Sequence, residues 1–276
     1  MEHFRLFVLP FWLGALFLLV ALLYKYILWF VKLEPAQRRM FFRSLPTRAT
    51  LRSLGEIASE SLLHRKIWRR NKLLGYMHTS FALGWFLLIV VGWTETLVYF
   101  KGENVPLYVD IFFSYYVHPI FEHNFNFSLI KDALLLLILV GVGLAWFKRI
   151  RSRAMGMRRT TKHLLGDRVA LSALWFVFPV RLIAESTTCA LYGGGGFLTG
   201  AVGAWMAEHV STLALMNLES AAWWAYSACL GIFFVALPFS RYMHIFTEIP
   251  LIFLRHYELR STEKEGSFDN FQVEAC

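Results

Sequence analysis

Long apolar runs separated by polar connectors dominate this chain. Each run approaches or exceeds the roughly 20 residues that a helix needs to cross a bilayer, and we predict that each forms one helix. The runs cover residues 6–31, 73–99, 129–147, 169–188 and 221–249. The pattern therefore predicts an all-α integral membrane protein: a bundle of five transmembrane helices over residues 1–260, followed by a polar tail at 261–276.

The composition agrees with this class. The chain is 57% hydrophobic and only 17% charged, whereas soluble domains carry about 25% charged residues. The first run follows a head with weak positive charge, and no small-residue cleavage site comes after it. We interpret this run as a retained helix, not as a signal peptide that is removed.

Basic residues concentrate in two of the connectors. Residues 32–72 hold eleven Lys and Arg against three acids, and residues 148–168 hold eight against one. In the connectors 100–128 and 189–220, the only Lys or Arg is Lys101. Under the positive-inside rule the two basic connectors are cytoplasmic. This predicts a multi-pass protein of the cell inner (cytoplasmic) membrane, with the N-terminus outside and the C-terminus in the cytoplasm.

The basic surface allows two interpretations. It orients the chain and attracts anionic lipid of the bilayer, or it docks an acidic cytoplasmic partner. The segment 49–71 is long enough to form an amphipathic helix for either role. Nothing in the connectors is typical of a nucleic-acid recognition module, so we expect no nucleic acid as partner.

The cysteines exclude one kind of electron carrier in this chain. Cys189, Cys229 and Cys276 show no CxxC spacing, so they build neither a zinc site nor a cysteine-ligated iron–sulfur cluster. Any such cluster would belong to a partner.

Two of the nine histidines, His78 and His244, fall inside predicted spans. Each lies about five residues, or very roughly 8 Å, from the cytoplasmic end of its span. Two neutral imidazoles at one depth on different helices suit the two axial positions of haem iron. The alternative is that each histidine only bonds a neighbouring helix. Aromatic residues that suit a flat macrocycle are Phe81, Trp85, Phe233 and Phe234.

Two stretches carry a resemblance to a known family. PFSRYMHIF, at the end of the fifth run, resembles the last helix of the respiratory nitrate reductase gamma subunit and of related membrane cytochromes in heterodisulfide-reductase-like and sulfite-reduction complexes. LLGYMHTSFALGWFLLIVVGW resembles that family's second helix. The resemblance covers residues from about 70 to 260, and its most specific element is PFSR-x-x-H.

The resemblance implies a function and a set of ligands. The family's subunits are cytochromes b that pass electrons between a membrane quinone (menaquinone or ubiquinone) and a cytoplasmic iron–sulfur subunit, which we expect on the basic connectors. His78 and His244 match the family's inner ligand pair, whereas Leu88 and Tyr226 occupy the outer ligand positions. The resemblance therefore implies one haem b instead of two. An alternative outer haem would take its ligands from His118, His123 and His209.

The fourth span offers polar groups near the position of the missing outer haem. Arg181 and Glu185 are four residues apart on one helix face, so they can pair, and Arg181 lies about 20 Å from Arg168 along the helix. We predict that Tyr226, Arg181 and Glu185 line a quinone pocket, because tyrosine and arginine donate to carbonyls and a carboxylate accepts a quinol proton. The alternative is a structural ion pair with Tyr226 as an interfacial anchor.

Smaller features carry their own expectations. Arg241 precedes His244 by three residues, so it would contact a haem propionate or reach toward the inner interface. Pro238 is expected to kink the fifth helix. Lys131 and Asp132 are expected to mark the outer boundary of the third span.

Two connectors on the outer side complete the picture. The glycines at 193–196 are expected to form a flexible turn, and the aromatic connector 105–127 is expected to lie along the outer surface.

Two other functions compete with the cytochrome. One is a haem-free membrane anchor for a soluble enzyme complex. The other is a small transporter, for which no inverted repeat is visible. We expect an electron-transfer subunit of a quinol-linked oxidoreductase complex that completes no reaction with a soluble substrate alone.

Overall fold

The computed structural model describes residues 5–102, 105–117, 125–156 and 164–259 of the 276-residue chain. Every regular element in these residues is a helix, and they form no strand. Five helices are long and apolar enough to cross a membrane: Leu6–Lys32, Lys72–Tyr99, Phe127–Ala154, Leu165–Tyr192 and Thr212–Phe239. The predicted class, an all-helical chain with five candidate membrane spans, is confirmed.

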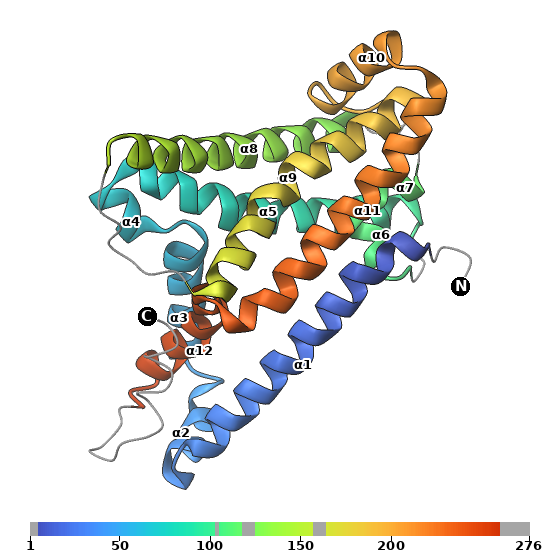
Figure 1. Ribbon diagram of the computed structural model, residues 1–276. Coiled ribbons are helices and arrows are strands. Elements are labelled where there is room, and N and C mark those ends of the chain that lie inside the picture. Colours follow the sequence, from blue (N-terminus) through green and yellow to red (C-terminus); the bar gives the residue numbers. More distant parts are fainter. Residues whose placement is uncertain (1–4, 103–104, 118–124, 157–163, 260–276) are drawn as a thin grey trace.

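Long helices form the bundle and shorter ones connect them (Figure 1). The long helices are α1 (Leu9–Lys32, after the 3-10 turn η1, Leu6–Val8), α5 (Lys72–Tyr99), α8 (Phe125–Ala154), α9 (Leu165–Tyr192) and α11 (Thr212–Ala236). The shorter ones are α2 (Pro35–Ser44), α3 (Arg48–Glu56), α4 (Arg65–Arg70), α6 (Tyr108–Ile111), α7 (Phe113–Tyr116), α10 (Thr199–His209) and α12 (His244–His256). A π-helical turn, η2 (Ile57–Leu62), follows α3, and two 3-10 turns, η4 (Leu237–Phe239) and η5 (Arg241–Met243), separate α11 from α12.

The two ends of the bundle differ in charge. Helices α1 and α8 end, and α5 and α9 begin, at the end where the connectors rich in Lys and Arg lie. We call this end the basic end, and the opposite end, where α10 lies, the far end (Figure 1).

Helix α11 lies between α9 and α1, and α5 packs along α8 (Figure 1). Helices α1 and α11 approach closely because Gly14 faces Gly231: a Cβ added to Gly14 would lie 2.6 Å from the Gly231 Cα. The backbone N–H of Phe11 also donates to Ser227 Oγ (3.1 Å). Small residues that let two backbones meet are typical of helix contacts in membranes.

Helix α1 is offset along α11 toward the basic end. Its first turn bonds Ser227, about 22 Å along α11 from the start of that helix. Further along, Lys25 Nζ donates to the Pro238 carbonyl (3.3 Å) and the Tyr26 hydroxyl donates to the Phe246 carbonyl (2.7 Å). Helix α1 therefore packs along the second half of α11, the two 3-10 turns and the start of α12.

The predicted fifth span, 221–249, is not one helix. Helix α11 begins earlier, at Thr212, and ends at Ala236. Pro238 has no N–H and its ring crowds the carbonyl four residues before it, so it ends the helix instead of only kinking it. Ser240 is extended, and its Oγ accepts the Tyr242 N–H (3.3 Å) as the chain turns into α12. The third and fourth spans are helical over longer stretches than predicted.

Two connectors also differ from expectation. The segment 49–71 is not one amphipathic helix, because the chain is interrupted at His64, whose φ is 50°. The described part of the aromatic connector, 105–117, enters the bundle instead of lying on its surface. Phe112 is fully buried, and its ring centre lies 5.5 Å from that of Tyr226.

The glycine contact between α1 and α11 is testable. Gly14→Ala should lower the stability by about 1–3 kcal/mol, because the added methyl overpacks a backbone contact. Gly143→Ala is the matched control, since nothing lies within 4 Å of its Cβ position and alanine is favoured in helices by up to about 1 kcal/mol. Thermal unfolding in detergent measures both; equal midpoints for the two variants would contradict the close contact.

Candidate functional site

Three histidines from separate elements come together at the basic end. His78 lies near the start of α5, His244 begins α12, and His64 precedes α4. The ring centres of His64 and His78 are 5.3 Å apart with 33° between the ring planes. Both rings are within electrostatic reach of His244. The structure therefore brings the two predicted haem ligands, His78 and His244, into one region.

The His244 imidazole is held by a backbone carbonyl. Its Nδ1 lies 2.5 Å from the Arg241 oxygen, so a neutral ring carries its proton on Nδ1 and presents the lone pair of Nε2. Such an outer hydrogen bond fixes the tautomer and orientation of metal-binding histidines. His64 has a similar but longer contact, from Nδ1 to the Leu62 oxygen (3.3 Å).

His64 was not among the predicted site residues. Burial lowers its pKa below the ordinary value, and His244 acts in the same direction, so the ring is neutral at pH 7. The spacing to His78 is that of neighbouring aromatic rings, so His64 lies next to that predicted ligand. Its left-handed backbone is uncommon outside glycine and often marks a functional site. That signal exists only in the folded chain.

Asp167 holds the turn that precedes His244. This carboxylate on α9 is 2% exposed; its Oδ1 accepts the Arg241 N–H (2.7 Å) and its Oδ2 lies 3.4 Å from Arg241 Nε. Oδ2 also accepts the Leu164 N–H (3.1 Å). Asp167 therefore fixes Arg241, whose carbonyl in turn fixes His244. The predicted propionate contact of Arg241 stays a prediction, and its half-exposed side chain is already paired.

The side chains gathered at the basic end are imidazoles, which can ligate iron. In the described ranges, no group of three or more His, Cys, Asp or Glu is placed to hold a metal. Haem iron is ligated in its plane by the macrocycle and needs only two imidazoles from the protein. His78 and His244 supply two imidazoles at the basic end, and their joint ligation of one haem stays a prediction.

The predicted aromatic lining lies on the far-end side of His78. The Trp85 ring centre is 5.4 Å from that of Phe178 and 5.6 Å from that of Phe233, and Phe81 also meets Phe178 (6.0 Å). These rings join α5, α9 and α11. Leu88, one turn further on α5, is 2% exposed in the same core.

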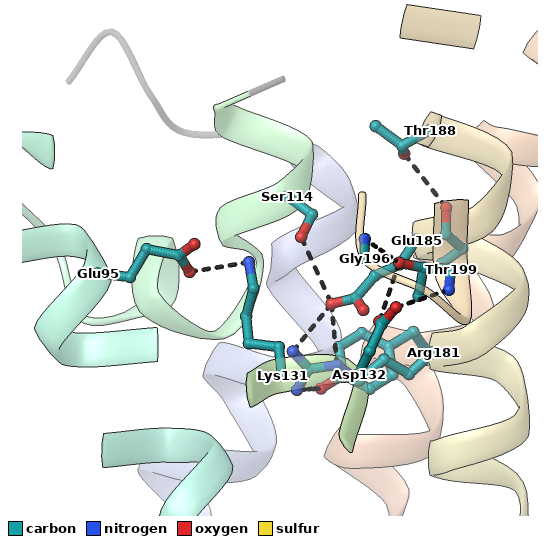
Figure 2. Close-up of polar contacts among 11 residues, drawn as sticks. Glu95, Ser114, Lys131, Asp132, Arg181, Glu185, Thr188, Gly196 and Thr199 are labelled. Carbon is teal, nitrogen blue, oxygen red and sulfur yellow. Dashed lines mark hydrogen bonds and ion pairs between the residues drawn. The ribbon is translucent and has the colours of Figure 1, made fainter. Parts of the chain in front are cut away.

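A second polar region is buried toward the far end (Figure 2). Glu185 Oε1 accepts from Arg181 through Nε (3.0 Å) and Nη2 (2.9 Å), and Arg181 Nη1 donates to the Tyr226 hydroxyl (3.5 Å). Ser114 Oγ lies 3.5 Å from the same carboxylate oxygen. The structure thus brings together Tyr226, Arg181 and Glu185. All three are more than nine-tenths buried, so Tyr226 is a core residue and not an interfacial anchor.

The room beside this group is small. The cavity that Glu185 and Ser114 line has a volume of about 10 Å³, which is space for about one water molecule. A quinone head group needs more room, and the longest polar contact of the group, between Arg181 and Tyr226, is the one that would have to open.

Lys131 and Asp132 do not begin the third span as expected, because the candidate span starts at Phe127, and both side chains are buried. Lys131 Nζ pairs with Glu95 on α5 (2.9 Å) and lies over the Phe113 ring. Asp132 accepts the N–H groups of Leu198 (2.6 Å) and Thr199 (2.9 Å), together with the Thr199 hydroxyl (2.9 Å). Its carboxylate therefore caps the start of α10.

The glycines at 193–196 do not form the flexible turn that the sequence predicted. Gly193, Gly194 and Gly195 have positive φ angles that other residues rarely adopt. A Cβ on Gly196 would lie 2.4 Å from Asp132 Oδ2. The segment closes tightly over α8.

Sequence reasoning missed several of these polar residues, although a signal was present. Glu95 interrupts the apolar run GWTETLV, and Lys131 interrupts SLIKDALLL. Ionisable residues inside apolar runs usually have partners and functions. Glu219 is a further case: it accepts from the Thr188 hydroxyl (2.7 Å), which also accepts from Trp223 Nε1 (3.0 Å).

The described residues do not provide a pair of histidine ligands for the alternative outer haem. His118 and His123 lie outside those residues. His209, on α10, stacks on the Trp205 ring (4.9 Å between centres), with its Nδ1 2.8 Å from the Trp205 oxygen.

Comparison with protein-family models, with curated proteins and with solved structures finds no match for this chain. The fold and the buried polar network toward the far end define its class: a helical protein with five helices long and apolar enough to cross a membrane, and with ionisable groups inside the bundle.

The Glu95–Lys131 pair makes a stability prediction. Lys131→Met should cost about 3–5 kcal/mol, because it leaves a buried carboxylate without its cation. The double variant Glu95→Gln/Lys131→Met should recover much of that loss. Unfolding in detergent, compared across the single and double variants, measures the coupling. Additive losses would show that the pair does not act as a unit.

Proposed function

We propose that this protein is a membrane-bound b-type cytochrome that carries electrons between a quinol and a partner at the basic end through one bis-histidine haem. The observation that carries the proposal is that His78 and His244 both lie at the basic end, His78 beside His64 and His244 oriented by the Arg241 carbonyl. The resemblance of PFSRYMHIF and of the second span to membrane cytochromes supports the same pair.

Depth supports the pairing as well. His78 lies about 9 Å along α5 from its first residue. His244 lies close to the level of Tyr26, because the Tyr26 hydroxyl bonds the Phe246 carbonyl, and Tyr26 is about 9 Å from the end of α1 at Lys32. Each imidazole therefore lies about 9 Å from the basic-end terminus of the long helix used to place it, α5 for His78 and α1 for His244.

The roles of the chain's own residues follow from these contacts. His78 and His244 would hold the iron, and the bound haem would supply one-electron chemistry. His64 shields His78 at one side and remains neutral. Asp167 orients His244 through Arg241.

We assign quinol binding to Tyr226, Arg181 and Glu185. The 3.5 Å contact between Arg181 and Tyr226 is at the outer limit of a hydrogen bond. It is the contact that a quinol oxygen would replace, and the surrounding side chains must move to admit the head group. Both side chains then donate to the ligand, and Glu185 is placed to accept its proton.

The partner is assigned to the basic connectors. Their exposed cations form a surface suited to an acidic protein that carries an iron–sulfur cluster, and the same cations would keep this end in the cytoplasm. The exposed cations of α2 to α4 and their connections are Arg39, Arg43, Arg48, Arg52, Arg65, Lys66, Arg69 and Arg70. A haem-free anchor would need only the spans and this surface, and a visible spectrum separates it from the cytochrome.

Haem content tests the proposal. The purified protein should contain one haem b per chain by pyridine haemochrome, and His78→Ala or His244→Ala should abolish it. His209→Ala is the matched control, because that histidine is also helical with Nδ1 against a carbonyl but lies at the far end. A wild type without haem, or haem retained in both ligand variants, would refute the assignment.

The role of Asp167 makes a separate prediction. Asp167→Asn should retain the haem but raise its midpoint potential, because removing a buried negative charge favours the reduced, less positive iron. Glu219→Gln, a buried carboxylate toward the far end, should leave the potential unchanged. Redox titration of the visible spectrum measures both, and an unchanged potential in Asp167→Asn would remove Asp167 from its positioning role.

A further inference from the structure

The small cavity in the far-end network is lined by two carboxylates from different helices. Glu185 of α9 and Asp132 of α8 line it together with the hydroxyl-bearing residues Ser114, Ser128 and Thr199. Its volume of about 10 Å³ matches one water molecule, and a buried water needs two to four polar partners. These side chains offer that number, so the cavity is suited to one hydrogen-bonded water.

The charged side chains around the cavity differ in the partners that they already have. Asp132 accepts three hydrogen bonds from the start of α10, which favour its ionised form. Lys131 lines the cavity too, but its charge is offset by Glu95 (2.9 Å). Glu185 has one cation, Arg181. Asp132 is therefore held at the start of α10, whereas Glu185 is the carboxylate of the cavity that pairs with Arg181, the partner of Tyr226.

The cavity also lies close to the far-end surface. Gly195 lines it and is partly exposed, and the adjacent Gly194 is exposed. Both have positive φ angles, 86° and 79°, and a Cβ on Gly195 would lie 2.6 Å from Cys189 Sγ, which also lines the cavity. Gly195 is therefore a residue at which the cavity lining reaches the surface.

We propose that a water in this cavity carries protons from Glu185 to the far-end surface, with Asp132 as the fixed counter-charge. The inference rests on the proposed function, because a quinol at Tyr226 and Arg181 supplies the protons. Each quinol that becomes quinone loses two protons and two electrons. As each O–H bond breaks, its proton passes to a Glu185 carboxylate oxygen, and its electron leaves toward the basic end.

The proton then leaves the quinol site. Glu185 gives it to the cavity water, where the negative charge of Asp132 stabilises the positive charge that forms. The water releases a proton past Gly195 to the surface. Glu185 becomes a carboxylate again and re-forms its pair with Arg181, ready for the second proton.

The test follows haem reduction by menadiol in the full-length protein held in lipid nanodiscs. Glu185→Gln should slow this reduction about a hundredfold, because an amide cannot take the proton. Ser114→Ala keeps every charge but removes one partner of the water, so it should slow the reaction and change the ratio of rates in H₂O and D₂O. Glu219→Gln, outside the cavity, should behave as wild type.

Controls separate the relay from the quinol site and from folding. Haem content, thermal midpoint and reduction by dithionite should be unchanged in Ser114→Ala. Wild-type rates and isotope ratios in both Glu185→Gln and Ser114→Ala would overturn the relay alone. A wild type whose haem is not reduced by menadiol would overturn the quinol assignment and the relay together, and loss of haem from the wild type would overturn the proposed function.

Discussion

A charged group inside an apolar medium is stable only when a partner of opposite charge, or a set of hydrogen-bond donors, compensates it. This constraint shapes the interior of the bundle. Glu95 pairs with Lys131 and joins α5 to α8, and Arg181 pairs with Glu185 beside Tyr226 of α11. Asp132 instead uses the free N–H groups at the start of α10. Each solution ties helices together at a defined level, so the polar groups position the apolar ones.

The same constraint explains how the chain tolerates a broken helix. Pro238 and Ser240 interrupt α11, and the interruption leaves backbone groups without helical partners. Lys25 of α1 donates to the Pro238 carbonyl, and Asp167 of α9 accepts the Arg241 N–H. Irregular backbone at membrane depth persists only where protein groups satisfy it in this way. A consequence of the break is that the Arg241 carbonyl meets His244 Nδ1, which sets the direction of the imidazole.

Hydropathy alone predicted the number and type of the long helices, because an apolar run of this length has few other stable conformations. The pairing of Arg181 with Glu185 followed from helical spacing, and the position of His78 near the start of α5 from its place in a continuous apolar run. The prediction of one continuous fifth helix was wrong, because hydropathy averages over Pro238 and Ser240 and does not detect the break that they cause. Contacts such as His64 with His78, or Asp167 with Arg241, join distant parts of the chain. No local pattern encodes them, since they depend on how the helices pack.

The central claim is that imidazoles from α5 and α12 meet on one iron at the basic end. Electron paramagnetic resonance with near-infrared magnetic circular dichroism of the oxidised, purified protein tests it most directly, because the two spectra together identify the axial ligands. The account predicts a single low-spin ferric haem with two histidine ligands. A high-spin haem, a haem with one histidine and another ligand, or two distinct haems would contradict it.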